Sequence, residues 1–341
     1  MKRCLAFCFL VAGLTLGLAL RARHSFAGTS AGPHERSFAF SYVVHVPALP
    51  EGSRQMRLWI PLPQSGPHQK ISNLRIESPV PHRTERESEY GNEYAYFEIP
   101  APAAKAPFDI RLTFNTQRLE HVVSLNPAGD PPGSDGVGRA ELVRFLQPDR
   151  LVPTNGVIAE LSREQTEGAK DPLTKARKIY DFVEATMRYD KSGEGWGRGD
   201  AVWACDSHHG NCTDFHSVFI GMARAAGIPA RFEIGFPLPA NQHEANIPGY
   251  HCWAYFYIEG IGWVPVDASE GWKDPAKRDY FFGALDENRV MFTVGRDIRL
   301  NPPEKGDPLN YSIYPYAEVD GKSFAGLKNE FSFRDVGTTA D

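Results

Sequence analysis

The first third of the chain alternates apolar and polar residues, a pattern typical of β-strands with one buried face. Phe38, Phe40, Tyr42 and Val44 alternate with smaller or polar residues. Four further short stretches have strand-like composition: Met56–Pro61, Ile71–Ile76, Tyr94–Ile99 and Phe108–Phe114. Turn residues separate them and no helical period interrupts them, so we predict an antiparallel β-sandwich domain over residues 37–123.

The pattern changes after residues 124–137, which are rich in Pro, Gly and Asp and predict a linker. Apolar residues then recur at helical spacing over 172–187 and again over 213–226, where Gly227 and Pro229 end the second helix. Strands are expected at Ala230–Phe236, Tyr250–Ile258, Trp263–Asp267 and within Tyr311–Val319. The fold class is therefore α+β, with a second domain over 138–330 and a flexible tail over 331–341.

Composition narrows the class of protein. The chain has 341 residues, of which 42% are hydrophobic and 23% charged, close to the globular average. This excludes a disordered chain, a coiled coil, a collagen-like rod and a polytopic membrane protein. The formal net charge is −5 and no basic stripe is visible, so nucleic acid is not expected as a partner.

The N-terminus has the three parts of a secretory signal peptide. Met1-Lys2-Arg3 is basic, Leu5–Leu20 carries no charge, and Ser25-Phe26-Ala27 places small residues where signal peptidase reads them. The alternative is an uncleaved anchor, but the apolar run of 16 residues is shorter than the about 20 that a spanning helix needs. We expect a signal peptide over 1–27 and an exported protein, periplasmic or secreted, with no stable membrane span after cleavage.

The exported chain keeps three cysteines, Cys205, Cys212 and Cys252. In an oxidising compartment an odd count leaves at least one thiol free, and a free thiol is a candidate nucleophile. Cys212 stands at the start of the second expected helix, where unpaired N–H groups and the helix dipole lower the pKa of a thiol. The alternative role is that of a small buried hydrophobic residue.

Two further residues complete a possible catalytic set. His251 begins an aromatic strand, and Asp267 ends the next strand after four apolar residues. Each has a structural alternative, a buried core histidine and a turn acid that caps Ser269. Together with Cys212 they supply a nucleophile, a base and a carboxylate that orients the base.

These residues lie in motifs that resemble the transglutaminase-like superfamily. The motifs are Gly-Asn-Cys-Thr-Asp-Phe (210–215), Ala-Arg-Ala-Ala-Gly-Ile-Pro-Ala-Arg (223–231), His-Cys-Trp-Ala (251–254) and Gly-Trp-Val-Pro-Val-Asp (262–267). The resemblance covers roughly residues 170–270. The rest of the chain, including the expected sandwich, resembles secreted bacterial members only in general style. It implies a papain-like core, with the Cys helix on an antiparallel sheet, in which Cys212 is the nucleophile, His251 the base and Asp267 its orienter. It implies no cofactor and no bound metal.

The register of the last hairpin tests this triad. With an even loop, Asp267 would oppose Ala254 and face away from His251, because side chains alternate along a strand. An odd loop of three or five residues, or a bulge near Pro265, places both on one face, and Gly260 and Gly262 make this easy. We therefore predict an odd connection or a bulge.

Several points stay open. Cys205, His208, Cys212 and His216 could instead ligate zinc, but that leaves the His251 and Asp267 pattern unexplained. Because Cys252 adjoins His251, we expect it to point away from Cys212; a disulfide with Cys205 is one alternative and two free thiols the other.

The sequence indicates only one of the two hydrogen-bond donors that an oxyanion hole needs. The Cys212 N–H is the expected first oxyanion donor, and Trp196, Trp203 and the Asn211 amide are candidates for the second. None of the three is favoured by the sequence.

The expected function is that of an exported cysteine-dependent enzyme that forms a thioester from a peptide or protein amide, with cell-envelope material a possible source. Residues 237–248 are polar, which suggests a solvated rim and hydrolysis rather than amine transfer. The alternatives are a protein-glutamine amine transferase that cross-links proteins and a non-catalytic cell-envelope binding or scaffold protein.

Overall fold

The computed structural model describes residues 32–125 and 138–337. The expected signal peptide, most of the expected linker and the last four residues lie outside this part of the chain. The described residues are α+β, as predicted: antiparallel sheets come first and a helical region with its own sheet follows. The longest helix here has 15 residues, and none within 32–125 and 138–337 combines the length and apolar character that crossing a membrane requires.

The helices are α1 (Arg139–Arg144), α2 (Gly156–Gln165), α3 (Pro172–Thr186), α4 (Ala201–Ser207), α5 (Cys212–Ala225) and α6 (Ala268–Lys273), with 3-10 turns η1 (Ala101–Ala104) and η2 (Pro275–Lys277). The N-terminal strands are β1 (Glu35–Val46), β2 (Gln55–Pro61), β3 (Gln69–Glu77), β4 (Arg83–Arg86), β5 (Glu93–Pro100), β6 (Phe108–Leu119) and β7 (His121–Val122). The later strands are β8 (Arg188–Tyr189), β9 (His209–Gly210), β10 (Ala230–Pro237), β11 (Glu244–Asn246), β12 (His251–Ile258), β13 (Gly262–Val266), β14 (Ala284–Leu285), β15 (Arg289–Val294), β16 (Tyr316–Val319), β17 (Lys322–Ser323) and β18 (Lys328–Asp335).

Two five-stranded antiparallel sheets form the sandwich. Their strand orders are β11-β18-β1-β6-β3, here called the outer sheet, and β17-β16-β2-β5-β4. In β6 the alternate residues Ile110, Leu112 and Phe114 are buried, as period-two patterning predicts. Apolar side chains of both sheets belong to a single hydrophobic cluster, so the sandwich is closed by its core.

The end of the chain differs from the sequence interpretation. Strand β18 pairs with β1 from Phe38↔Asp335 to His45↔Lys328, and Phe331 and Phe333 are 6% and 3% exposed. The flexible tail expected from residue 331 is therefore wrong for residues 331–335. The missed signal was the alternation of Phe331 and Phe333 with polar residues. Two apolar residues in so short a segment are a weak indication of a strand.

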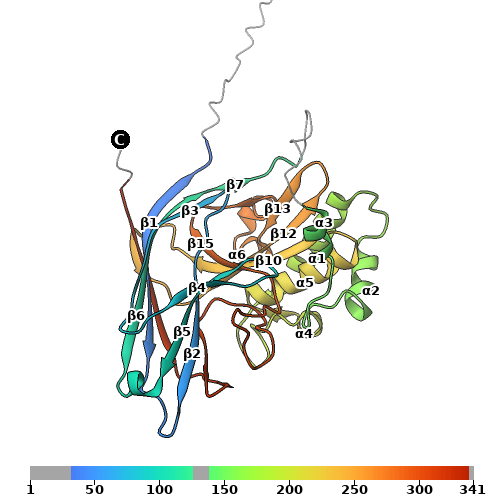
Figure 1. Ribbon diagram of the computed structural model, residues 1–341. Coiled ribbons are helices and arrows are strands. Elements are labelled where there is room, and N and C mark those ends of the chain that lie inside the picture. Colours follow the sequence, from blue (N-terminus) through green and yellow to red (C-terminus); the bar gives the residue numbers. More distant parts are fainter. Residues whose placement is uncertain (1–31, 126–137, 338–341) are drawn as a thin grey trace, which may run out of the picture. The chain divides into compact units, whose positions relative to one another are not determined.

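A third antiparallel sheet, β13-β12-β10-β15, lies between the sandwich and the helices and is called the central sheet below. In Figure 1 helices α2 to α5 gather on one side of β12 and β10, and the long sandwich strands lie on the other. Aromatic rings join the sheets directly: Phe40 and Phe236 have centroids 5.5 Å apart, and Phe114 and Phe292 5.9 Å. The sandwich and the central sheet thus share one continuous core.

Both long helices follow their sequence signals. Helix α3 begins with Pro172 in its first turn, and the Asp171 side chain caps it by accepting from the Thr174 N–H at 2.8 Å. Helix α5 is buried at almost every position and packs against β12. The segment before α5 contains the short helix α4.

Candidate active site

Cys212 is the first residue of α5, as predicted, and its exposed fraction is 1%. Asn211 caps the helix by accepting from the Thr213 N–H at 2.9 Å. The Asp214 carboxylate completes the capping box and also accepts from the N–H groups of Gly197 and Gly199, at 2.6 Å and 2.9 Å. The glycine-rich segment before α4 is therefore tied to the helix end that carries the thiol.

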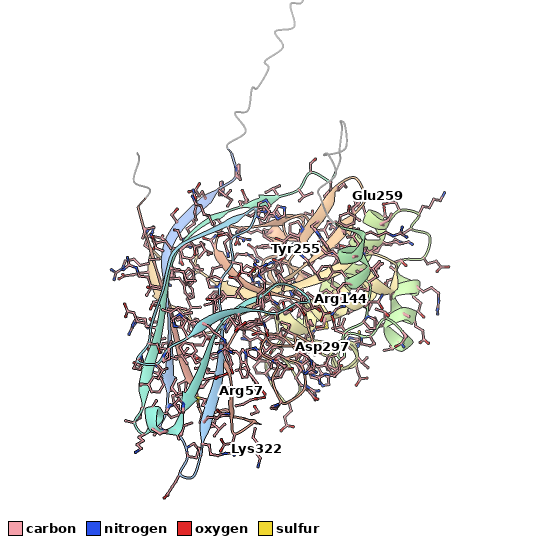
Figure 2. The ribbon with its side chains drawn as sticks, in the orientation of Figure 1. Arg57, Arg144, Tyr255, Glu259, Asp297 and Lys322 are labelled. Atoms are coloured by element: carbon pink, nitrogen blue, oxygen red, sulfur yellow. The ribbon has the colours of Figure 1, made fainter. Side chains whose placement is uncertain are left out.

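The hairpin between β12 and β13 has the predicted odd connection. Ile258 pairs with Gly262 and Ala254 with Val266, so residues 259–261 form a three-residue loop. Figure 2 shows Glu259 at the tip of this hairpin and Tyr255 in the interior. This register directs His251 and Asp267 to the same face of the sheet.

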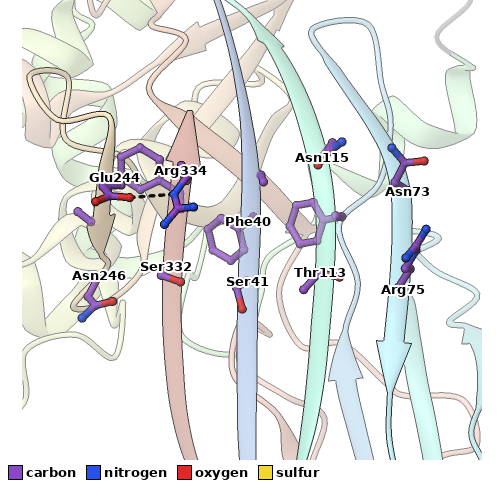
Figure 3. Close-up of a pocket in the computed structure, with 14 residues that line it drawn as sticks. Phe40, Ser41, Asn73, Arg75, Thr113, Asn115, Glu244, Asn246, Ser332 and Arg334 are labelled. Atoms are coloured by element: carbon purple, nitrogen blue, oxygen red, sulfur yellow. Dashed lines mark hydrogen bonds and ion pairs between the residues drawn. The ribbon is translucent and has the colours of Figure 1, made fainter. Parts of the chain in front are cut away.

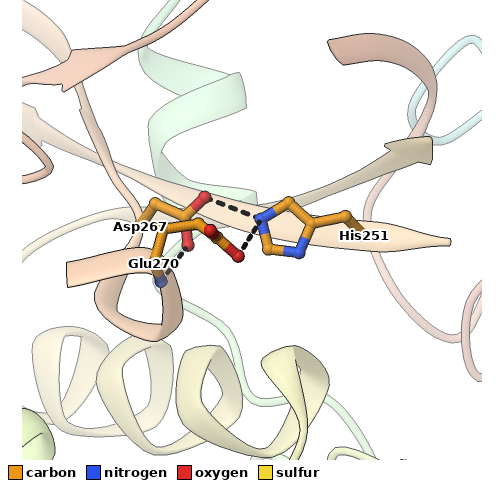
Figure 4. Close-up of side chains that lie close together, drawn as sticks. All are labelled: His251, Asp267 and Glu270. Carbon is orange, nitrogen blue, oxygen red and sulfur yellow. Dashed lines mark hydrogen bonds and ion pairs between the residues drawn. The ribbon is translucent and has the colours of Figure 1, made fainter. Parts of the chain in front are cut away.

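His251 and Asp267 are in direct contact. The ring Nε2 lies 2.7 Å from Asp267 Oδ2, and both side chains are almost fully buried (Figure 4). Because Nε2 is held by Asp267, Nδ1 is the ring nitrogen left for Cys212, and the ring and the thiol are hydrogen-bonded. The structure therefore brings the three predicted site residues together.

Asp267 has more partners than the sequence indicated. Arg289 on β15 donates to Asp267 Oδ2 at 3.0 Å. The other carboxylate oxygen accepts from Ser269 Oγ and the Glu270 N–H, both at 3.1 Å, and so caps α6. The turn-capping alternative and the orienting role are thus both satisfied by one carboxylate, each through its own oxygen.

These contacts set the charges of the site. Burial opposes ionisation of Asp267, but the His251 and Arg289 cations and the hydrogen bond outweigh it and hold its pKa well below the usual range. Burial also lowers the pKa of His251, yet Asp267 and the Cys212 thiolate raise it to about 10. Burial raises the pKa of Cys212, but hydrogen bonds from Cys252 and His251 and the imidazolium charge bring it well below its usual value. The favoured state is a thiolate–imidazolium pair.

The expectation for Cys252 is wrong. Its thiol is hydrogen-bonded to Cys212 and does not point away from it. His251 and Cys252 are the first two residues of β12, at the strand end beside the start of α5, and both side chains reach the Cys212 sulfur there. Cys205, Cys212 and Cys252 are all free thiols, so the structure contains no Cys205–Cys252 disulfide.

The residues of the zinc alternative do not converge. His216 uses both ring nitrogens: Nδ1 lies 2.7 Å from the Cys212 carbonyl oxygen, and Nε2 accepts from the Ala268 N–H at 3.1 Å. Cys205 and His208 line a separate apolar hollow beside α2 and α4. His216 therefore joins α5 to α6 as a neutral ring, and burial lowers its pKa.

Within the described residues, the one cluster with metal-like donors is His251, Asp267 and Glu270. Glu270 Oε1 is 3.8 Å from His251 Nε2 and pairs with Lys273 at 2.7 Å. The Arg289 guanidinium already supplies a cation to Asp267, and His251 is protonated, so these donors are engaged with each other. The cluster is accounted for by the triad and its neighbours.

The Asn211 amide, a candidate for the second oxyanion donor, already uses one of its two N–H groups. The Asn211 amide donates to Tyr250 Oη at 3.0 Å. Trp203 packs against Gly195 and lines the hollow beside α2 and α4. The Cys212 N–H belongs to the first turn of α5, whose donors have no intrahelical acceptors.

A shallow hollow of about 700 Å³ lies elsewhere, on the face of the outer sheet that is turned away from the core (Figure 3). Its lining is polar and apolar in equal parts, and its polar members include Asn115, Arg75 and the Glu244–Arg334 pair at 2.8 Å. None of its residues belongs to the triad, so its size says nothing about the chemistry. It also contains residues 244–246, which pair with β18 as an edge strand, so part of the expected solvated rim is anchored to the sandwich.

Comparison with known proteins gives the relatives of the chain. Residues 159–268 match the profile of the transglutaminase-like superfamily. An uncharacterized protein of Haemophilus influenzae is 30% identical over 321 residues, which cover 84% of this chain and 86% of that protein. An uncharacterized protein of Mycobacterium leprae is 23% identical over 253 residues, with coverage of 72% and 83%.

One solved structure resembles nearly the whole chain. It is a protein of Cytophaga hutchinsonii, provisionally named a cysteine protease, with a TM-score of 0.62 and 15% identity. The similarity covers 90% of this chain and 93% of that one. At this identity it shows the fold alone, and that fold includes the sandwich as well as the transglutaminase-like region.

Proposed function

The chain belongs to the same family as the Haemophilus influenzae protein and contains a transglutaminase-like superfamily domain, and on this premise we propose that it is a papain-like cysteine enzyme of the secreted bacterial type that forms a thioester from a peptide or protein amide. Cys212 is the nucleophile, His251 the general acid and base, and Asp267 the group that orients the imidazole.

One observation carries this proposal: three ionisable groups from three elements meet in a buried triad. Cys212 comes from the N-terminus of α5, His251 from β12 and Asp267 from the end of β13. A thiolate beside a buried imidazolium whose other nitrogen is held by a carboxylate is the arrangement that an activated cysteine needs. A scaffold protein would gain nothing from the cost of burying these charges.

The geometry supports the following reaction. The Cys212 thiolate adds to the amide carbonyl, and the oxyanion that forms lies near the N-terminal N–H groups of α5. His251 Nδ1–H gives its proton to the departing amine as the C–N bond breaks, which leaves a thioester and a neutral imidazole. Water then loses a proton to His251 and attacks the thioester, which releases a carboxylic acid and restores the thiolate.

Access is a separate requirement of the proposal. Cys212 and His251 are only 1% and 4% exposed, so a substrate reaches the sulfur after a neighbouring segment moves. The thiol is therefore protected in the closed form, and the reactive pair becomes available when substrate binds.

We propose hydrolysis rather than amine transfer as the second half-reaction. Residues 241–244 are exposed and polar, and lack the apolar walls that would exclude water from an amine. A glutamine peptide offered with a fluorescent primary amine tests this partitioning. More free acid than amine adduct supports a hydrolase, whereas a predominance of adduct identifies a cross-linking transferase.

The thioester itself can be tested without knowledge of the substrate. Hydroxylamine traps an acyl-enzyme as a hydroxamate, and intact-mass spectrometry detects an acyl group on Cys212. We expect peptide-dependent acylation in the wild type, none in Cys212→Ala, and wild-type behaviour in Cys205→Ala. Absence of acylation with a broad peptide library, together with slow uniform alkylation of all three thiols, would identify a non-catalytic scaffold.

We also propose that the protein acts outside the cytoplasm. The basic start and uncharged run of residues 1–27 support this, and the proposed substrates are peptides or proteins of the cell envelope. Cell fractionation with N-terminal sequencing of the mature protein tests the location and the cleavage after Ala27. Recovery of the full-length chain from the cytoplasm would refute both.

A further inference from the structure

A hollow of about 440 Å³ lies between the sandwich and the central sheet, apart from the triad. The sandwich side supplies Arg118 at the end of β6, and the central sheet supplies Arg231, Tyr255 and Trp263. Tyr255 is four residues beyond His251 on β12, about 13 Å along the strand. No triad residue lines this hollow.

Arg118 is the unusual member. It is 4% exposed, and among residues 32–125 and 138–337 neither Nε nor Nη2 has a hydrogen-bond partner. A guanidinium cannot shed its proton at physiological pH, so a buried one normally has a carboxylate or carbonyl acceptor. Burial and the nearby Arg289 charge lower the pKa of Arg118, and the Glu233 and Asp286 carboxylates offset this only in part. Arg118 lines the hollow, and its two donors without an acceptor, Nε and Nη2, are buried beneath the surface of the hollow.

The other charges at the hollow are already balanced. Arg231 pairs with Glu233 at 2.9 Å, and Glu233 also accepts from Trp253 Nε1 at 3.0 Å. The exposed Glu141 lies 3.8 Å from Arg231. Arg118 and Arg231 carry two positive formal charges, and Glu233 and Glu141 carry two negative ones. Arg118, however, contacts neither carboxylate. One negative charge on a ligand would match the unpaired Arg118 guanidinium, whereas a second would be repelled by Glu233 and Glu141.

Two stacked histidines form one wall. The rings of His68 and His121 have centroids 3.6 Å apart. Burial, with the nearby Arg118 charge, lowers the pKa of His68 to about 4, and burial with the His68 and Arg118 charges lowers that of His121 to about 3. Both rings are therefore neutral near pH 7 and offer planar, apolar surface.

The opposite wall adds further donors. The Arg231 guanidinium stacks on Trp263, with its carbon 4.4 Å from the ring centroid. Among the residues that the structure describes, Arg231 Nε and Trp263 Nε1 are also buried without a hydrogen-bond partner. Three side chains that line the hollow thus each carry at least one buried N–H group without an acceptor, and no described residue of the lining has a buried acceptor without a donor.

We propose that this hollow binds the carboxylate of a small organic acid, with Arg118 as the principal ligand. The carboxylate accepts from the Arg118 fork, the bidentate arrangement that guanidinium and carboxylate groups favour. Trp263 Nε1 and Arg231 Nε provide the further donors. The stacked histidine rings pack against the apolar body of the acid.

The test uses N-acetylglycine, its neutral amide N-acetylglycinamide, and methyl phosphate as probes. Thermal shift and calorimetry on the full chain should show saturable binding of N-acetylglycine and none of the amide. Arg118→Gln should weaken binding about tenfold or more, because a charge-assisted hydrogen bond is lost. Arg111→Gln is the matched control, an exposed arginine on the same strand, and should bind as the wild type does.

A second variant keeps the proposal testable if Arg118→Gln fails to fold. Trp263→Phe keeps an aromatic ring at this position but removes the N–H donor, and should weaken binding by about threefold to tenfold. On binding, the histidine NMR signals of His68 and His121 should shift in the wild type. Absence of saturable binding, equal affinity in Arg118→Gln, or tighter binding of methyl phosphate would each overturn the carboxylate assignment.

The inference stands apart from the proposed enzyme activity. Cys212→Ala removes the nucleophile but leaves every residue of the hollow unchanged. This variant should therefore bind N-acetylglycine with wild-type affinity even if no amide is ever found to acylate Cys212. Failure of the anion site and failure of the enzyme proposal are thus read from different measurements.

Discussion

Two buried arginines differ in their partners: Arg289 belongs to the central sheet and Arg118 to the outer sheet. Arg289 is enclosed by two carboxylates, Asp267 at 3.0 Å and Asp286 at 3.2 Å, whereas Arg118 has no acceptor for Nε or Nη2 within the described residues. Burial alone lowers the pKa of either guanidinium, but the two carboxylates reverse this for Arg289 and raise its pKa. The comparison teaches that burial does not define a role for a charge. A paired arginine holds a carboxylate in place, and an unpaired one is placed to receive a ligand.

The largest expected effect concerns Cys212, the nucleophile of the triad whose carboxylate pairs with Arg289. Cys212→Ser should abolish acyl-enzyme formation, with activity reduced by about 10³-fold or more, since a serine hydroxyl is not ionised by a neighbouring imidazole at rest. Intact-mass spectrometry after incubation with an active peptide measures this. Cys205→Ser is the control, because burial raises the pKa of that thiol to about 11 and it lies in a separate hollow. Equal loss in both variants would remove Cys212 from the mechanism.

The next effect concerns the carboxylate that both His251 and Arg289 contact. Asp267→Asn should reduce acyl transfer by about 10³-fold, because the amide favours the wrong imidazole tautomer and no longer supports the imidazolium. The His251 pKa should fall from its value of about 10, which histidine NMR measures directly. A variant that loses activity but keeps the His251 pKa would show that Asp267 acts only as the cap of α6.

The comparison of the two arginines is tested most directly by stability. Arg289→Gln should lower the free energy of unfolding by about 3 kcal/mol, since it removes the cation that pairs with the buried Asp267 carboxylate and the partly exposed Asp286 carboxylate. Arg118→Gln should not lower it in the absence of ligand, because it removes a buried charge that has no hydrogen-bond partner. Urea denaturation of both variants under identical conditions gives the two values. If Arg118→Gln is as destabilising as Arg289→Gln, Arg118 has a structural partner.

The charge state of the triad predicts a pH window. The pKa of His251 is raised to about 10, so the stability from its ion pair is complete below its ordinary value of about 6.5 and is lost as pH rises through about 10. The Cys212 pKa is depressed, so the thiolate contribution is present above the ordinary thiol value and is lost as pH falls through the folded pKa. Ultraviolet absorbance of the thiolate, with Cys212→Ser as the blank, should show ionised thiol at neutral pH. A thiolate that appears only above about pH 8.5 would contradict the ion pair.

The smallest expected effect concerns the neighbour of the nucleophile. Cys252→Ala removes a hydrogen bond to the Cys212 sulfur and should raise the Cys212 pKa by less than about one unit. The same absorbance titration measures it, and Cys205→Ala should leave the curve unchanged. A fall in the Cys212 pKa would mean that Cys252 accepts rather than donates.

Much of the candidate site was readable from sequence because its parts are local. Asn211 and Asp214 cap the start of α5, and the odd hairpin loop was predicted because the triad requires it and Gly260 and Gly262 permit it. The alternation rule failed for Cys252, since it describes directions within a strand and not which neighbour lies beside the first residues of the strand.

The partners that sequence reasoning missed come from elements that only the fold brings close. Arg289 is 22 residues beyond Asp267, on a strand that reaches the site through β10, and carries no motif of its own. Arg118 reads as an ordinary strand arginine, because only the assembled sheets show that its donors are buried and unmatched.

The pairing of β1 with β18 has a consequence for the order of synthesis. Arg36 and Asp335 form an ion pair at 2.9 Å although 299 residues separate them, and Phe236 of the central sheet packs on Phe331 with centroids 4.3 Å apart. Translation therefore completes all three triad residues well before the strand that closes the shared core exists. A nascent chain that stops before β16 leaves edges of both sandwich sheets open, and such edges mispair readily. We expect the growing chain to need a holding chaperone until residue 335 emerges, so that a working thiol is assembled only in a finished molecule.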